Sequence, residues 1–384
     1  MKYVKSPFYI QILFVCTLSL IKVTTSGAES VPPPPSITSK AHILVDYHSG
    51  QVLAAFNPDQ RLEPASLTKI MSADVIFKEL TAGHIKLTDD VLISEHAWRT
   101  GGSRTFAEVG KHFTVETLLR GAIIQSGNDA TVALAEHIAG SEQTFAEMMN
   151  TQAKVLGLTN SHFMNATGLP DPDHYSSAHD MARIATATIR EYPNFYKIYS
   201  QKEYEVNGIK QRNRNRLLWR DSSVDGIKTG HTEGAGFCLV ASAQRGDQRL
   251  ISVIMGSKNQ EMRAADSLTL LNYGFRFYET HKLYEKRQVL GKVRVWKGAY
   301  GEVDAGPAEE VYVTVPRQQY ENLELVREIA PALNAPVRAG QKIGQVVVRL
   351  GGKEITQVPL VALTDAPEGG MFRYLMDTII LWFN

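Results

Sequence analysis

The hydrophobic pattern separates the chain into a mixed region and a region with only strand-like spacing. Two pairs of apolar runs, over residues 42–56 and 237–255, are joined by turn residues as β-hairpins are. The second pair is apolar almost throughout, which is typical of strands covered on both faces. Between and after the hairpins, apolar residues recur at helical spacing. This order predicts an α+β fold over residues 39–280, with helices around one antiparallel sheet.

The helical segments expected from this spacing cover residues 64–76, 115–139, 145–156, 181–189 and 264–278. The second of them is interrupted by polar residues around Ser126. Polar groups between two buried segments need partners, so this interruption is either a cap or a site. Residues 88–114 and 157–173 are polar and contain glycine, and both are predicted to be loops, the first on the surface.

From about residue 289 the helical spacing disappears. Apolar runs separated by turn residues cover 289–295, 311–315, 346–350 and 355–363. They predict a separate all-β domain over residues 285–364. It contains no recognisable set of catalytic residues, so we expect a spacer or a platform for a partner.

The N-terminus has the pattern of an export signal. Lys2 and Lys5 precede an apolar run over residues 8–21, which is too short for the roughly 20 residues that span a bilayer. Small residues follow, so residues 1–28 are predicted to be a cleaved signal peptide. An uncleaved anchor is the alternative. Residues 29–38 are rich in proline and are expected to form a stiff linker.

The C-terminus, residues 368–384, is predicted to be an amphipathic helix. Its apolar face comprises Phe372, Leu375, Met376, Ile379, Ile380 and Phe383. Arg373 and Asp377, four residues apart, lie on the other side. The segment is too short to cross a bilayer, so we expect it to lie in the plane of a membrane surface. A terminal helix docked on the protein's own core is the alternative.

Charge and cysteine content exclude several classes of function. Without residues 1–28 the chain has 38 basic and 40 acidic residues. It therefore lacks the excess of basic residues that is typical of nucleic-acid-binding proteins. Only Cys238 remains, so no intramolecular disulfide can form. The histidines are scattered without the spacing of metal ligands, and no metal or cofactor is expected.

The first candidate for chemistry is the pair Ser66 and Lys69. Pro64 suits the first turn of a helix, and residues three apart share one helical face. The pair therefore places a base beside a nucleophile at a helix N-terminus, where the helix dipole favours a developing anion. The pattern Ser-x-x-Lys is weak by itself, since it also occurs at Ser19 within the expected signal peptide.

Two further patterns follow in order along the chain. Ser126 and Asn128 frame a Ser-x-Asn group, and Lys228-Thr229-Gly230 lies on a short strand-like segment that should face the Ser66 helix. A glycine on a strand lets another backbone approach closely. At Gly230 we expect this to be the backbone of a ligand. The three patterns together match those of class A β-lactamases and penicillin-binding proteins.

From about residue 38 onward the chain resembles the low-molecular-mass penicillin-binding proteins that act as D-alanyl-D-alanine carboxypeptidases. The amino-acid sequences of residues 224–232 and 126–130 match those of the family almost letter for letter, and segments 213–215 and 274–279 also resemble family segments. The resemblance implies a penicillin-binding, serine β-lactamase-like catalytic domain. It also implies that Ser66 attacks the penultimate D-alanine of a peptidoglycan stem peptide and is acylated by β-lactam antibiotics.

The resemblance also implies roles for the other residues. Lys69 serves as base only if neutral, and burial and the positive charge of Lys228 are expected to lower its pKa. Ser126 relays the proton to the leaving amine, and Asn128 orients the substrate amide. The remaining roles are an oxyanion hole from the backbone N–H groups of Ser66 and His231, and binding of the terminal carboxylate by Lys228, Thr229 and Arg214. Arg263 matches a family position, although structural pairing explains it equally well.

Several alternatives stay open. A β-lactamase would need a deacylating carboxylate, typically in a Glu-x-x-Leu-Asn stretch, and residues 165–171 have no such sequence. A non-catalytic penicillin-binding protein of morphogenesis is disfavoured by the intact patterns, and a D,D-endopeptidase shares the same chemistry. We expect an exported, peripheral protein on the periplasmic side of the inner membrane, and association into a homodimer is left open.

Overall fold

The computed structural model describes residues 31–382, so the predicted signal peptide lies outside the described residues. The first part of the fold is built on a five-stranded antiparallel sheet in the order β2-β1-β9-β8-β7. Its strands are β1 (Ala41–Asp46), β2 (Val52–Phe56), β7 (Val224–Thr232), β8 (Gly236–Arg245) and β9 (Gln248–Ser257). Both predicted hairpins are confirmed. The strand with the Lys-Thr-Gly pattern, β7, forms the edge of the sheet.

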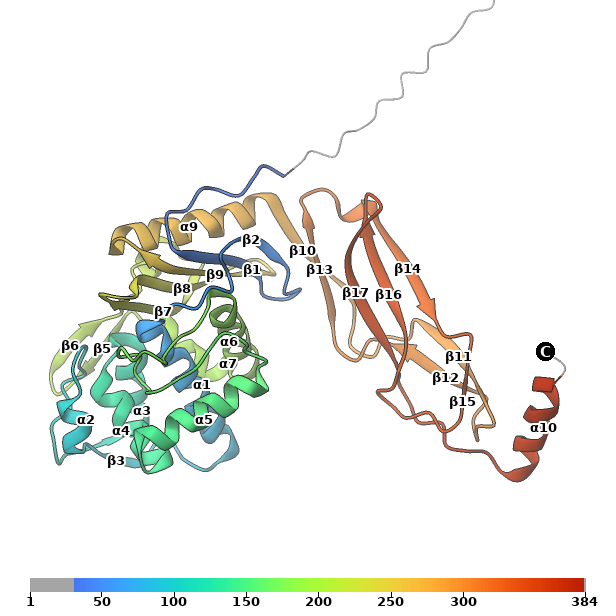
Figure 1. Ribbon diagram of the computed structural model, residues 1–384, viewed down its shortest axis with the longest axis horizontal. Helices are drawn as coiled ribbons and strands as arrows, with labels where there is room; N and C mark the ends of the chain where they lie inside the picture. Colours follow the sequence, from blue (N-terminus) through green and yellow to red (C-terminus); the bar gives the residue numbers. More distant parts are fainter. Residues whose placement is uncertain (1–30, 383–384) are drawn as a thin grey trace, which may run out of the picture. The chain divides into compact units, whose positions relative to one another are not determined.

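Helices cover both faces of this sheet, as the continuous burial of β8 and β9 requires. Figure 1 shows α9 (Gln260–Phe277) on one face and the remaining helices on the other. These include α1 (Thr68–Ala82), α3 (Val115–Arg120), α4 (Asn128–Ala139), α5 (Glu142–Val155), α6 (Ala178–Glu191) and α7 (Pro193–Tyr196). The α+β prediction is therefore confirmed.

Helix α1 is the central helix of this part. Its first ten residues are all buried, and it packs against α4, α5 and α6. The short turn η1 (Ala65–Leu67) precedes it and carries Ser66. Gly83 ends the helix in the left-handed conformation that glycine adopts at little cost. Packing on three helices fixes the position of the residues at the start of α1.

The prediction of a loop over residues 88–114 is wrong. The segment contains β3 (Asp90–Leu92), which pairs with β4 (His112–Thr114), and the short helix α2 (Glu95–Arg99). Ser94 caps α2 by accepting a hydrogen bond from the N–H of Ala97. Elements of three to five residues are too short to show a hydrophobic period, which is why the pattern missed them. The hairpin β5 (Glu203–Val206) and β6 (Ile209–Arg212) and the helix α8 (Leu217–Arg220) were missed for the same reason.

The second part of the fold is entirely β, as its hydrophobic pattern predicts. A six-stranded sheet has the order β14-β16-β17-β12-β11-β15, and β10 (Tyr278–Tyr284) pairs with β13 (Val311–Pro316) beside it. The strands of the larger sheet are β11 (Gly291–Trp296), β12 (Glu302–Gly306), β14 (Leu323–Ile329), β15 (Ala332–Asn334), β16 (Lys342–Leu350) and β17 (Lys353–Ala362). Strand β10 follows α9 directly and covers the expected boundary near residues 280–285.

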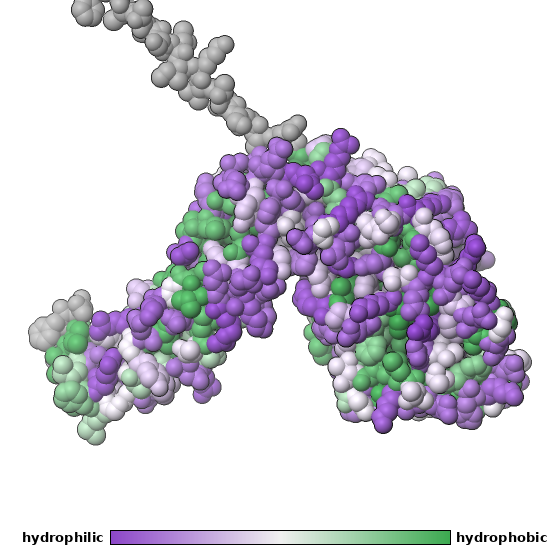
Figure 2. Space-filling view, turned by 180° about the vertical axis from the view of Figure 1, so that it is seen from behind, coloured by the Kyte–Doolittle hydropathy of each residue, from purple (hydrophilic) through white to green (hydrophobic). Residues whose placement is uncertain are grey.

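The chain continues into helix α10 (Met371–Trp382). Asp377 is the buried residue of this helix and accepts a hydrogen bond from the backbone N–H of Lys297 at 2.6 Å. Figure 2 shows apolar surface gathered over this end of the chain, where Met371, Phe372 and Trp382 are each at least 80% exposed. Within residues 31–382 no helix combines the length and the apolar character needed to cross a membrane.

Candidate active site

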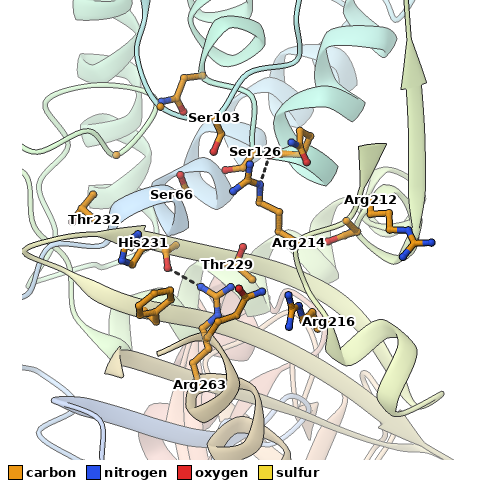
Figure 3. Close-up of a pocket in the computed structure, with 18 of the residues that line it drawn as sticks. Ser66, Ser103, Ser126, Arg212, Arg214, Arg216, Thr229, His231, Thr232 and Arg263 are labelled. Atoms are coloured by element: carbon orange, nitrogen blue, oxygen red, sulfur yellow. Dashed lines mark hydrogen bonds between the residues drawn. The ribbon is translucent and has the colours of Figure 1, made fainter. Parts of the chain in front are cut away.

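A cavity of about 1000 Å³ lies between the η1 turn, the start of α4 and strand β7. Figure 3 shows Ser66, Ser126 and Thr229 around this cavity, with the side chain of Arg214 reaching between them. His231 and Gly230 also line it, as does Asn128. The three sequence patterns, which are far apart in the chain, are therefore brought to one place. Lys69 and Lys228 lie behind the cavity wall and are each 2% exposed.

Lys69 is held by three hydrogen bonds from its Nζ atom. It donates to Ser66 Oγ at 3.2 Å, to Asn128 Oδ1 at 2.6 Å and to the carbonyl oxygen of Thr167 at 2.7 Å. All three bonds are donated when Lys69 is charged; the neutral amine has two N–H bonds, which suffice for Asn128 and Thr167, and it then accepts from the Ser66 hydroxyl. The expected pairing of nucleophile and base is thus present in the geometry.

The pKa of Lys69 is lowered to about 7, chiefly by burial and then by the positive charge of Arg214. Asp129 and Glu142 oppose this shift. The expected effect of burial on Lys69 is present, and the repulsion expected between Lys69 and Lys228 appears as a lowering of the pKa of Lys228. The pKa of Lys228 is itself lowered well below its ordinary value by burial first and by Lys69 second. Arg214 keeps its positive charge at neutral pH and lies close enough to both lysines to lower the pKa of each.

Two contacts that position Lys69 were not expected from the sequence, one with Asn128, which was assigned to the substrate amide, and one with the carbonyl of Thr167. The amide of Asn128 accepts from Lys69 and donates to the carbonyl of Gly101 at 2.6 Å, so it connects the base to the opposite cavity wall. Thr167 contributes only its backbone carbonyl, which leaves no side-chain signature. Its loop is held by Asn165 Oδ1, which accepts from the N–H groups of residues 167, 168 and 169. That asparagine-centred turn was the available signal.

Ser126 lies at the junction between two helical segments. A π-helical turn over residues 121–125 ends there, and Ser126 adopts the left-handed conformation with φ of 68°. Its side chain is 2% exposed, and within residues 31–382 its Oγ atom has no hydrogen-bond partner. A buried hydroxyl without a partner is unfavourable, so this position indicates a site rather than a cap.

Gly230 lets strand β7 approach the η1 turn. A Cβ atom there would lie 2.9 Å from the carbonyl oxygen of Pro64, 3.2 Å from Ala65 Cβ and 3.2 Å from the nitrogen of Leu67. The side of Gly230 on which a Cβ would lie is thus occupied by the η1 turn, while Gly230 also lines the cavity, so its contact with a ligand backbone stays a prediction. The close approach brings the backbone on either side of Gly230, Thr229 and His231, next to Ser66.

The wall of the cavity is strongly cationic. Among the described residues that line it, none is acidic and five are arginines: Arg212, Arg214, Arg216, Arg220 and Arg263. Arg263 also has a structural function, because its Nη1 donates to the carbonyls of Gly230 at 3.0 Å and Cys238 at 3.3 Å. Residues 31–382 contain no cluster of side chains suited to hold a metal ion. The arrangement suits covalent catalysis by a serine on an anionic substrate.

Comparisons with known proteins agree with this geometry. A family model described as D-alanyl-D-alanine carboxypeptidase (peptidase S11) matches residues 28–259, and one described as penicillin-binding protein 5, C-terminal domain, matches residues 278–368. D-alanyl-D-alanine carboxypeptidase DacC of Escherichia coli K12 is 44% identical over 96% of this chain and 94% of its own length. DacA of the same organism is 44% identical over 92% of this chain and 90% of its own length.

Solved structures show the same likeness. The crystal structure of penicillin-binding protein 5 from Haemophilus influenzae has a TM-score of 0.84 and 44% identity, and covers 88% of this chain and 100% of its own. A structure of penicillin-binding protein 6B from Escherichia coli has a TM-score of 0.72 at 35% identity. The chain belongs to the peptidase S11 family of serine-type D-alanyl-D-alanine carboxypeptidases.

Proposed function

We propose that this protein removes the terminal D-alanine from peptidoglycan stem peptides through an acyl-enzyme on Ser66. The observation that carries the proposal is the hydrogen bond between Lys69 Nζ and Ser66 Oγ at 3.2 Å, combined with the lowered pKa of Lys69 of about 7. A neutral lysine beside a serine hydroxyl activates it as a nucleophile near neutral pH. The family and the full-length relatives support the same reaction.

In acylation, Lys69 takes the proton of Ser66 Oγ while that oxygen bonds to the carbonyl carbon of the penultimate D-alanine. The backbone N–H groups of Ser66 and His231 are proposed to receive the oxyanion. The carbon–nitrogen bond then breaks, and the proton passes through Ser126 to the departing amine. Water next attacks the ester and gives a proton to Lys69, and Ser66 recovers its hydrogen as the shortened peptide leaves.

The terminal carboxylate is proposed to bind at Thr229, Lys228 and Arg214. Lys228 Nζ is buried and donates to the carbonyl of Thr229 at 3.2 Å. An arriving carboxylate favours the charged form of a lysine, so binding would raise the pKa of Lys228 and form a charge-assisted contact. Asn128, beyond holding Lys69, is proposed to orient the substrate amide with the second lone pair of its oxygen.

The experiment compares two substrates that differ only in this carboxylate. D-alanine release from a peptide ending in D-Ala-D-Ala is measured beside release of D-alanine amide from the matched peptide amide. Loss of a charged hydrogen-bonded contact costs about 1.5–3 kcal/mol, so kcat/KM should be roughly ten- to a hundredfold lower for the amide. Equal rates would contradict the proposed carboxylate contact. Penicillin labelling without release from either substrate would leave a non-catalytic penicillin-binding protein as the better description.

The cavity also bears on the response to β-lactams. No acidic residue lines it within the described part of the chain, so no carboxylate is placed there to activate a deacylating water. We propose that penicillin acylates Ser66 and remains bound, with slow release. A β-lactamase function is correspondingly disfavoured.

Helix α10 is proposed to attach the exported protein to the outer face of the cytoplasmic membrane. Twelve residues of helix reach about 18 Å, less than the roughly 30 Å hydrocarbon core, so the helix would lie in the interface. Its buried Asp377 faces the β domain while large apolar side chains remain exposed. Such a face suits insertion at the boundary of headgroups and acyl chains.

Removal of α10 is expected to abolish binding to lipid vesicles. Protein comprising residues 29–384 should sediment with zwitterionic vesicles, while residues 29–370 should stay in solution with the same D-alanine release. The variant Phe372→Ser/Leu375→Ser keeps the helix length and should behave like the truncated form. Binding of the truncated form, or self-association of the full form without lipid binding, would contradict the proposal.

Substitution of Gly230 by alanine is expected to slow penicillin labelling at least tenfold. The added Cβ would overlap the η1 turn, and overpacking of this kind costs about 1–3 kcal/mol. The turn that carries Ser66 must then move. Gly370→Ala is the control, because a Cβ there has no heavy atom within 4 Å. An unchanged labelling rate in Gly230→Ala would show that the close packing of β7 on η1 is not needed to position Ser66.

A further inference from the structure

The cationic wall of the cavity extends beyond the groups proposed to bind the terminal carboxylate. On β7, His231 lies beside the Ser66 turn, and Thr229 comes two residues earlier on the same face of the strand. Helix α8 packs against β7, and Asn215 just before the helix donates to the carbonyl of Gly226 at 2.9 Å, in the first half of the strand. Trp219 and Arg220 of α8 line the same cavity, as does Arg216 just before the helix. These three residues therefore lie on the leaving-group side of Thr229.

A single D-alanine does not need this additional wall. The leaving group of a D-Ala-D-Ala peptide ends at its carboxylate, which Thr229 and its neighbours would already receive. The cavity of about 1000 Å³ is at the upper end of the range for small-molecule sites. Arg216 also borders a small recess together with Thr229 and Arg263, so the cationic surface is continuous from one to the other. Figure 3 shows Arg216 beside Thr229 and Arg263, on the side away from Ser66.

The spacing of two of these arginines fits one carboxylate. Glu261 bridges them in the structure, with Arg216 Nη1 at 2.8 Å from its Oε1 and Arg220 Nη2 at 2.5 Å from its Oε2. The Glu261 side chain is 60% exposed. Exposed ion pairs of this kind contribute only about 0–1 kcal/mol, so a competing carboxylate can replace Glu261 at little cost. The protein's own glutamate thus shows what the arginine pair binds.

We propose that Arg216 and Arg220, with Trp219 as an apolar wall, form a leaving-group subsite for a second carboxylate. The protein would then cleave D-Ala–X bonds in which X is an acidic D-residue larger than D-alanine. The inference rests on the proposed function, because the bond broken and the acyl-enzyme formed are unchanged. Trp219, which is 44% exposed, would cover the methylene groups of such a residue. Glu261 acts as an internal competitor for the same arginines.

The test uses three peptides that share one N-terminal part and end in D-Ala-D-Ala, D-Ala-D-Gln or D-Ala-D-Glu. D-Gln and D-Glu have nearly the same shape and differ in charge, so the ratio of their kcat/KM values isolates the second carboxylate. In the wild type this ratio should favour D-Glu by up to about fivefold, since an exposed ion pair contributes about 0–1 kcal/mol. It should also fall as salt is raised, since the contact is partly exposed.

Variants at the two sides of the ion pair should move the ratio in opposite directions. Arg220→Gln is expected to bring the ratio of D-Glu to D-Gln close to one, and Arg220→Lys should restore part of it. Glu261→Gln removes the competitor and should raise the ratio above that of the wild type. Both substrates are measured on the same preparation, so a partly unfolded variant lowers both rates and leaves the ratio unaffected. Penicillin labelling reports the folded fraction.

The outcomes separate this inference from the function on which it rests. A wild-type ratio of one or below, or a ratio that Arg220→Gln leaves unchanged, overturns the subsite while D-alanine release from D-Ala-D-Ala continues. Failure to release D-alanine from D-Ala-D-Ala overturns the proposed function itself. A ratio that favours D-Glu and collapses in Arg220→Gln supports the subsite.

Discussion

Ser66→Ala is expected to abolish both D-alanine release and covalent labelling by penicillin. Within residues 31–382 the Oγ atom of Ser66 is the one hydroxyl that is hydrogen-bonded to Lys69 Nζ, at 3.2 Å. Removing the atom that forms the ester leaves the cavity, its arginines and the oxyanion groups in place without a nucleophile. Release should fall by at least about a thousandfold, as for the loss of a covalent nucleophile with its base. Release is followed by chromatography and labelling with a fluorescent penicillin.

The control for this substitution is Ser103→Ala. Ser103 lines the same cavity, but its hydroxyl is not among the hydrogen-bond partners of Lys69. It should keep labelling within about threefold of the wild type, an effect typical of a surface substitution. Labelling of Ser66→Ala at the wild-type rate would mean that another residue is the nucleophile, and Ser126→Ala would then be the variant to measure.

Lys69→Met is expected to lower the rate of acylation by about a hundred- to ten-thousandfold, the contribution of a positioned general base. Methionine keeps an unbranched apolar side chain in the buried position, so the core is changed little. The matched control is Lys78→Met on the same helix, whose Nζ donates to Gln152 away from the cavity. It should leave the rate unchanged.

The pH dependence follows from the pKa of Lys69 of about 7. The base acts when neutral, so the acylation rate should rise through pH 7 and fall about tenfold for each pH unit below it. Stability changes in the same direction. The folded state binds fewer protons than the unfolded state between pH 7 and the ordinary lysine pKa, so stability rises with pH across that window. In Lys69→Met the rise of the acylation rate should disappear and that of the stability should become smaller, with the part due to buried Lys228 remaining. A flat wild-type rate profile between pH 6 and 8 would refute the role.

The long elements of the fold followed from the hydrophobic pattern. The two hairpins and helices α4, α5, α6 and α9 bury continuous or periodic apolar residues, and such a pattern is readable in one dimension. The short elements β3, β4, α2 and α8 could not be predicted from the sequence, because they are too short to show a hydrophobic periodicity. Contacts with neighbouring elements stabilise them. Helix α8 matters most, since it carries part of the cavity wall.

The sequence by itself determined the family, the ordered set of Ser66, Lys69 and the later patterns, and the close pairing of nucleophile and base. Residues three apart at a helix start must be neighbours, whatever surrounds them. Only the tertiary structure decided that Asn128 and the Thr167 carbonyl hold Lys69, and that Gly230 is required by the Ser66 turn. It also decided that burial and the charge of Arg214 lower the pKa of Lys69. Desolvation and charge repulsion depend on distances between segments remote in sequence, and the fold alone sets those distances.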